Sequence, residues 1–358
     1  MAQTTDQATS ADVFYAYRLI LGREPDAPGL TAHVKNITDN AVSVANLRAD
    51  FMRSNDFLVL AANPQAGQSV FLHYDSCFDA DQVIRSYEVQ NLGPTEGYLT
   101  NFLGVLINPK FFPSLLAERA GTIDHLPIPS NWHADMAEWA AVLRAVDLSH
   151  DHFTMIELGC GWGCWMNNTG VAARRAGRLV HLIGVEGDAV HFSFAEQALS
   201  KNGFSDTEVT LHRGIAASTS GMALFPQANR DGHAWGGQPK FGVSDAESDA
   251  AVLSGEYDAL RMFSFAELAG SHEVIDLLHI DIQGGEADFI DGSIEILSQR
   301  VRYIVIGTHS RSLEGRLFDT MLSAGWKLEI ERPGLLHLNE DGPFMHVDGV
   351  QGWRNRAL

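Results

Sequence analysis

Glycines and acidic residues occur together where two strands are expected to end. Glu157 precedes Gly159, Gly161 and Gly163 in the run IELGCGWG, which joins a short apolar strand to a helix. Glycines in a strand–turn–helix let the backbone approach a ligand closely and turn sharply. The next expected strand ends at Glu186, whose carboxylate can accept hydrogen bonds from both hydroxyls of a ribose. In this strand order the two features predict a cofactor that contains a nucleoside.

The spacing of the glycines separates two cofactor classes. A dinucleotide site needs G-x-G-x-x-G, but Cys164 stands at the position of the third glycine. The observed G-x-G-x-G, with an acid two residues before it, is typical of S-adenosylmethionine sites. There, no phosphate has to be bound, and the acid can face the cationic methionine part. Cys160, Gly187 and Asp281 complete the predicted cofactor-binding set.

Two further residues are candidates for proton transfer. Asp281 and His309 end the fourth and fifth expected strands, and ligands of open α/β sheets bind at the carboxyl ends of strands. A neutral imidazole near pH 7 suits His309 as the general base of a methyl transfer. Asp281 is expected to contact the cofactor, orient the acceptor or act as the base. The alternatives are a structural histidine and, for Asp281, a helix cap.

The sequence gives weaker signals for an acceptor site and for a metal site. The stretch 216–262 interrupts the pattern and carries His233 and Trp235, which are candidates to close over an acceptor, with a sugar ring stacked on the indole. Trp235 as a simple loop anchor is the alternative. Gln283 cannot take a proton, so it can only position a substrate. The fifth strand ends in Gly307-Thr308-His309 without an acid, and no metal site is therefore expected.

Strands alternate with helices in the second half of the chain, which predicts a mostly parallel α/β sheet covered on both faces. The last two strands lack a helix between them and should form an antiparallel hairpin. Glycine-rich and apolar runs place strands over 153–158, 179–186, 208–215, 275–282, 301–306, 326–331 and 344–350. Helices are expected after the glycine loop and over 189–201, 286–298 and 313–324, with an earlier amphipathic helix in PIPSNWHADMAEWAAVLRAV and a small helical unit before it.

Composition limits the class of protein. The 358 residues carry a formal charge of −20 and a 45% hydrophobic share, which excludes general disorder. So acidic a chain argues against binding to a nucleic-acid backbone or an anionic membrane. Three cysteines fit no disulfide framework, and neither a signal peptide nor a membrane span is apparent. We therefore expect a soluble, cytoplasmic protein.

The C-terminal 200 residues resemble the FkbM-type S-adenosylmethionine-dependent methyltransferases. The resemblance depends on IELGCGWG, GVEGD and LLHIDIQGGEADFI, the last being similar to the family pattern K-x-D-x-E-G-x-E. His279 stands at the lysine position and Gln283 at the first glutamate, whereas Asp281, Gly284 and Glu286 agree. The resemblance implies a Rossmann-like class I methyltransferase fold, S-adenosylmethionine as cofactor, and O-methylation.

The N-terminal unit resembles a small helical domain of bacterial surface-layer and glycan-modifying proteins, through FYAYRLILGREPDAPGL and FMRSNDFL. This implies a docking or scaffold role, through which the chain could bind partners or form a homo-oligomer, and it favours a sugar or glycan acceptor. The expected organisation is a disordered tail (1–10), a helical domain (11–60), a mostly helical linker (61–147) and a methyltransferase domain (148–358). N- or carboxylate methylation, a nicotinamide dehydrogenase and a non-catalytic assembly protein are the alternatives.

Overall fold

The computed structural model describes residues 7–358 except 22–24, 26, 55–56, 58–69, 228–231, 233 and 341. The chain divides into two compact units, Met1–His73 and Tyr74–Leu358. His233 and the first six residues of the expected tail therefore lie outside the described residues.

The first unit is a small helical bundle. Ser43 caps α3 by accepting a hydrogen bond from the backbone N–H of Asn46. Its core contains Val13, Tyr17, Leu47 and Phe51. The elements are α1 (Ser10–Leu21), α2 (Ala27–Asn40), α3 (Val44–Arg53) and the 3-10 turn η1 (Val70–Leu72). The sequence analysis missed α2, because its first turn contains a proline and a glycine. A proline is tolerated there, since the first N–H groups of a helix have no intrahelical partner.

The segment after residue 73 is less helical than the sequence suggested. It contains a three-stranded sheet in the order β3-β2-β4 beside its helices, which the expected mostly helical linker over 61–147 did not include. Short strands with few apolar positions carry too little periodicity to be recognised. The elements are β1 (Asp75–Ser76), α5 (Ala80–Ser86), β2 (Leu99–Thr100), β3 (Leu106–Ile107), η2 (Pro109–Phe111), α6 (Pro113–Leu116), η3 (Ala117–Arg119) and β4 (Thr122–Ile123).

The main sheet has eight strands in the order β1-β13-β16-β12-β11-β5-β6-β7. Neighbours from β12 to β7 are parallel, whereas β16 runs antiparallel between β12 and β13. The chain order reverses between β5 and β11, so this edge of the sheet is the expected ligand site. The bounds are β5 (His152–Leu158), β6 (Leu179–Glu186), β7 (Val209–Arg213), β11 (Ile275–Ile280), β12 (Val301–Thr308), β13 (Lys327–Arg332) and β16 (Gly349–Arg354).

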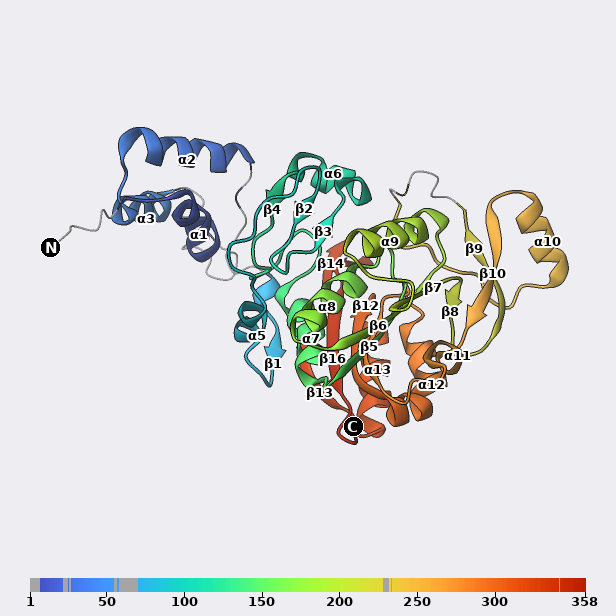
Figure 1. The fold of residues 1–358 in the computed structure, drawn as a ribbon. Coiled ribbons are helices and arrows are strands. Elements are labelled where there is room, and N and C mark those ends of the chain that lie inside the picture. The colour runs from blue at the N-terminus through green and yellow to red at the C-terminus, as the bar shows by residue number, and fades with distance from the viewer. Residues whose placement is uncertain are drawn as a thin grey trace. The chain divides into compact units, whose positions relative to one another are not determined.

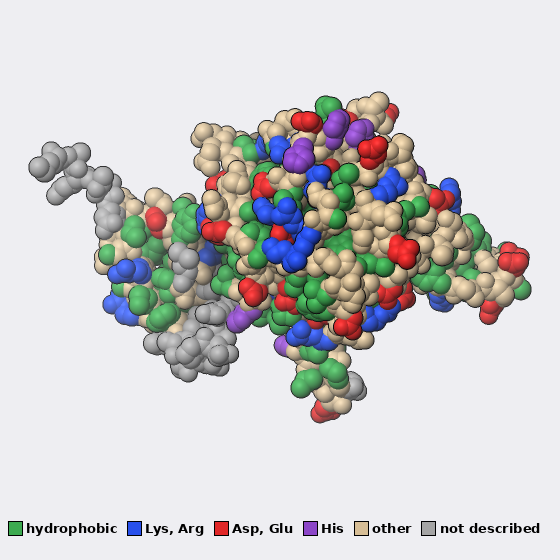
Figure 2. Space-filling view, turned by 90° about the horizontal axis from the view of Figure 1, so that it is seen from below, with side chains coloured by type: hydrophobic (Ala, Val, Ile, Leu, Met, Phe, Trp, Pro, Cys, Tyr) green, Lys and Arg blue, Asp and Glu red, His purple; other side chains and the backbone are tan. Residues whose placement is uncertain are grey.

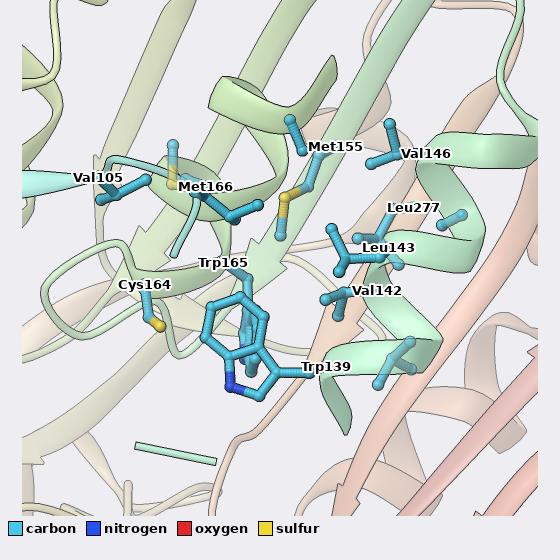
Figure 3. Close-up of a cluster of buried hydrophobic side chains, with 14 of the residues drawn as sticks. Val105, Trp139, Val142, Leu143, Val146, Met155, Cys164, Trp165, Met166 and Leu277 are labelled. Atoms are coloured by element: carbon cyan, nitrogen blue, oxygen red, sulfur yellow. The ribbon is translucent and has the colours of Figure 1, made fainter. Parts of the chain in front are cut away.

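Helices cover both faces of this sheet, as Figure 1 shows. Alternating residues along a strand face opposite layers: Met155 packs with the first layer and Ile156 with the second. Figure 3 shows the first layer, where Trp139 and Trp165 meet edge to face near Met155. The first layer contains α7 (Met136–Leu148), α8 (Cys164–Arg175) and α9 (Ala189–Lys201), and the second contains α11 (Phe265–Ala269), α12 (Glu286–Arg300) and α13 (Arg311–Ser323).

Two segments differ from the predicted α/β pattern. The stretch after β7 forms β8 (Ile215–Ala216), β9 (Gly221–Pro226), α10 (Asp245–Leu253) and β10 (Tyr257–Phe263), with a second sheet in the order β8-β10-β9. At the C-terminus the antiparallel partner of β13 is β16. The expected strand 344–350 falls largely in an extra hairpin, β14 (Leu335–Asn339) and β15 (Gly342–Val347), inserted between them.

The surface accounts for much of the acidic charge. Figure 2 shows acidic side chains scattered among other types over the face seen from below.

Within the described residues, no helix has both the length and the apolar character needed to cross a membrane.

Candidate active site at the carboxyl end of the sheet

The glycine loop between β5 and α8 has a backbone that only glycine adopts easily. Gly159, Gly161 and Gly163 have φ angles of 74°, 55° and 74°. A Cβ atom at Gly159 would lie 2.0 Å from the backbone oxygen of Asp281. The loop after β5 and the loop after β11 are therefore in direct backbone contact, which leaves no room for a side chain.

Two buried carboxylates support this loop. Glu186 accepts hydrogen bonds from the N–H of Gly161 (2.8 Å) and of Asp188 (2.7 Å). Glu157 accepts from the N–H of Trp165 (3.2 Å) and of Met166 (2.9 Å) at the start of α8. Burial raises the pKa of each carboxyl to about 7. Both groups thus titrate near neutral pH, where a ligand that favours the carboxylate can shift their protonation.

Four polar side chains meet beyond the ends of β11 and β12. Asp281 Oδ1 lies 3.0 Å from Gln283 Nε2 and 3.2 Å from His309 Nε2. His309 Nδ1 lies 3.0 Å from Glu286 Oε1. Burial alone would lower the pKa of His309, but the two carboxylates outweigh it and raise this pKa to about 10. Burial would likewise raise the pKa of Asp281, yet His309 and Gln283 hold it below its ordinary value.

The insertion after β9 crosses the glycine loop. The Trp235 ring stacks on His191 at 3.7 Å between centroids and on Phe112 at 4.3 Å. Its edge would be 2.8 Å from a Cβ at Gly161, so the indole lies on the loop itself. Gln238 anchors the same segment by donating to the backbone oxygen of Gln283 at 3.0 Å. A ligand that contacts Gly161 must therefore contact or move Trp235.

This placement predicts an optical signal. Titration with S-adenosylmethionine should change the intrinsic tryptophan fluorescence, because the stacking of Trp235 is altered when the loop is occupied. Trp235→Phe should lose most of that change and still bind the ligand, as checked by calorimetry. An identical fluorescence change in the variant would place Trp235 outside the ligand's reach.

These residues surround one cavity of about 1050 Å³. This volume is at the upper end of the range for ligand pockets, so a cofactor and a second molecule fit together. The predicted residues that line it are Glu157, Gly159, Cys160, Gly161, Glu186, Gly187, Trp235, Asp281 and Gln283. Gly163 instead begins α8, and His309 lies behind Asp281 and Gln283.

The sequence analysis missed a second polar pair in this cavity. His279 Nε2 lies 3.0 Å from Glu138 Oε1 of α7, and both residues line the cavity beside His133. Burial would lower the pKa of His279, but Glu138 outweighs it and raises this pKa. Glu138 thus favours the charged form of His279, at the position where the family pattern has a lysine. The available signal was Glu138, an acid in the first turn of a largely apolar helix.

Comparisons with known proteins show the family of the chain. The model of the FkbM methyltransferase domain matches residues 163–327. A protein of Jannaschia sp. that carries the general name methyltransferase is 41% identical over 275 residues, which cover 77% of this chain and 98% of that protein.

Two solved structures are also similar. The FkbM methyltransferase of Methylobacillus flagellatus is 12% identical, with a TM-score of 0.37 over 60% of this chain and 53% of that one. Precorrin-6Y C5,15-methyltransferase of Geobacter metallireducens is 10% identical, with a TM-score of 0.35 over 62% and 88%.

The chain belongs to the FkbM methyltransferase family. It is a methyltransferase, and its family and fold imply S-adenosylmethionine as the methyl donor. The residues present fit that cofactor. The glycine loop leaves its backbone open to a ligand. Glu186, at the end of β6, and Glu157 line the same cavity, where their carboxylates would face the ribose and the cationic methionine part.

Proposed function

We propose that this protein transfers the methyl group of S-adenosylmethionine to a hydroxyl of a sugar, glycan or related small molecule. The observation that supports it most is the position of Asp281. This carboxylate stands at the cavity wall beside the glycine loop, with 42% of its side chain exposed. An O-methyltransferase needs a proton acceptor at such a point, because the acceptor hydroxyl loses its proton as the new bond forms.

The bound cofactor supplies an electrophilic methyl group on a sulfonium sulfur. Transfer of this methyl group to an acceptor hydroxyl, with the sulfur leaving as the neutral thioether, would release the hydroxyl proton, and the Asp281 carboxylate would take it. The sequence favours His309 as the base. We now favour Asp281, since both ring nitrogens of His309 already face other side chains of the cluster, Glu286 on one side and Asp281 and Gln283 on the other. His309 then acts by holding Asp281 in place.

Aromatic rings favour a sugar as the acceptor. Phe112 and Trp235 are stacked with 8° between their planes, and Trp132 lies edge-on to Phe112 at 5.2 Å. All three line the cavity and give it an aromatic wall, which suits the apolar C–H groups of a pyranose ring. The acidity of the chain agrees with a neutral acceptor better than with a polyanion.

The proposal also includes the role of the N-terminal helical unit and the location of the protein. The helical unit before residue 74 serves as a docking or scaffold module, whether for a partner or for a second copy of the chain. The cytoplasm is the proposed location. The cavity lining, and not this unit, supports the catalytic proposal.

A panel of acceptors tests the proposed reaction. Release of S-adenosylhomocysteine should rise with one class of hydroxyl-bearing saccharide and stay at background with amines and carboxylic acids. Asp281→Asn should lower kcat by about 100-fold or more, in the range of a lost general base. Turnover on an amine or a carboxylate alone would favour the corresponding alternative methyltransferase and overturn the hydroxyl acceptor.

A further inference from the structure

Three side-chain atoms beyond β11 and β12 form a nearly equilateral triangle. Asp281 Oδ1 and Gln283 Nε2 are 3.0 Å apart, Gln283 Nε2 and His309 Nε2 are 3.0 Å apart, and His309 Nε2 and Asp281 Oδ1 are 3.2 Å apart. Adjacent ligands of an octahedral ion are separated by √2 times the metal–ligand distance. For a distance of about 2.1 Å this gives about 3.0 Å. The triangle thus has the size of one face of an octahedral metal site.

No arrangement of protons satisfies all three edges. If His309 Nε2 carries a proton, this N–H group faces the Gln283 NH₂ group, which is also a donor. If it does not, its lone pair faces the Asp281 carboxylate. Turning the Gln283 amide over brings its oxygen against the same carboxylate. A cation removes this conflict, because the carboxylate oxygen, the amide oxygen and the imidazole nitrogen all present lone pairs to it.

Glu286 supports His309 from the other side. Its side chain is fully buried, and its oxygens accept hydrogen bonds from the N–H groups of Ile282 (2.9 Å) and Gly284 (3.1 and 3.0 Å). Oε1 also lies 3.0 Å from His309 Nδ1. This carboxylate favours a proton on Nδ1, so Nε2 is the nitrogen directed at Asp281 and Gln283, as it is around a metal-bound histidine.

We propose that Asp281 Oδ1, Gln283 Oε1 and His309 Nε2 bind a divalent cation, with Glu286 holding His309 in position. Asp281, Glu286 and His309 each offer a ligand atom within 4.8 Å of the others. One imidazole with two oxygen ligands suits Mn²⁺ or a similar first-row ion better than Mg²⁺, which prefers oxygen alone. The absence of a metal was inferred from the lack of an acid at the end of β12. Asp281 and Gln283, from the neighbouring loop, supply the oxygen ligands instead.

The site has a role in the proposed reaction, and this part rests on the proposed function. Asp281 and Gln283 line the cavity, so the open positions of the ion face the acceptor. A hydroxyl oxygen bound there is oriented and more acidic. Two neighbouring hydroxyls, as in a sugar diol, would occupy two of these positions.

Metal binding is measured without cofactor or acceptor, so it is independent of the proposed reaction. Protein stripped with a chelator should bind one Mn²⁺ per chain, followed by calorimetry and by the loss of the free-ion signal in electron paramagnetic resonance. His309→Gln and Asp281→Asn should each weaken binding by at least 10-fold. Gln283→Glu should tighten it by about 10-fold, since a carboxylate replaces a neutral ligand.

The control is His279→Gln, which removes a histidine from the same cavity but not from the triangle. It should leave Mn²⁺ affinity within twofold. Thermal melts establish that each variant is folded, and Gln283→Glu keeps the test valid if the other variants do not fold. Failure of the wild type to bind Mn²⁺, or binding that is unchanged by Gln283→Glu and His309→Gln, overturns the proposal.

Discussion

Gly159→Ala should abolish binding of S-adenosylmethionine at concentrations that saturate the wild type. The new Cβ would lie 2.0 Å from the backbone oxygen of Asp281, and φ at this position is 74°. Neither loop can move freely. The N–H of Gly159 donates to Val185 O, and the N–H of Asp281 donates to Leu158 O. We expect affinity to fall by at least 100-fold, and the free energy of unfolding by roughly 3 kcal/mol.

Calorimetry with S-adenosylmethionine and urea unfolding are the measurements. Gly315→Ala is the matched control, because this glycine of α13 has nothing within 4 Å of an added Cβ. Alanine there should stabilise the helix by about 0.5–1 kcal/mol and leave binding unchanged. Gly161→Ala covers the case in which Gly159→Ala does not fold, since its Cβ meets the side chain of Trp235 and not backbone. Wild-type affinity in Gly159→Ala would mean that the glycine loop does not bind the cofactor.

Glu186→Gln should weaken cofactor binding and change the pH dependence of stability. The carboxylate accepts two backbone N–H groups, whereas an amide offers one oxygen and turns its NH₂ group toward the second donor. Loss of a charged acceptor for the ribose hydroxyls should cost about 30-fold in affinity or more. In the wild type, affinity should also rise between pH 6 and pH 8, because the site then holds the carboxylate.

The direction of the stability effect follows from the raised pKa. Glu186 titrates at about 7 in the folded chain, against an ordinary value of 4.5. Between these values the folded state binds more protons than the unfolded state, so the free energy of unfolding falls as pH rises from 4.5 to 7. At about 1.4 kcal/mol per pKa unit, the loss is on the order of 3 kcal/mol. In Glu186→Gln this position has no ionisable group, so the free energy of unfolding does not fall for this reason as pH rises.

Urea unfolding of both proteins at several pH values checks the effect. The wild type should be most favoured relative to Glu186→Gln near pH 5, and this advantage should shrink by pH 8. Glu157, which titrates in the same range, is present in both proteins and cancels in the comparison. Parallel curves for the two proteins would mean that Glu186 does not carry a raised pKa.

The main sheet and the cofactor loop could be predicted from the sequence because their signals are local. Apolar runs mark β5, β6 and β11, and a glycine or an acid ends or directly follows each strand: Gly159, Glu186 and Asp281. The limits of β6 and α9 agree with the prediction to the residue. The strands β2, β3 and β4 have two residues each, too few for any period to show.

The contacts of the site could not be predicted in the same way, because they join residues far apart in sequence. Glu138 and His279 are 141 positions apart, and they meet because α7 packs on β11. The triangle of Asp281, Gln283 and His309 depends on the offset between two parallel strands and on the positive φ of Gln283. The types of individual residues identified the candidate site residues. The distances between those residues follow only from the fold.

The central claim is the transfer of a methyl group to a hydroxyl oxygen. The most direct measurement follows the ¹³C-labelled methyl group of S-adenosylmethionine by nuclear magnetic resonance in the presence of a saccharide acceptor. We predict a new O-methyl signal on the saccharide, formed in step with S-adenosylhomocysteine and lost in Asp281→Asn. A label that appears on nitrogen or on a carboxylate, or that stays on the cofactor with every hydroxyl acceptor, would contradict it.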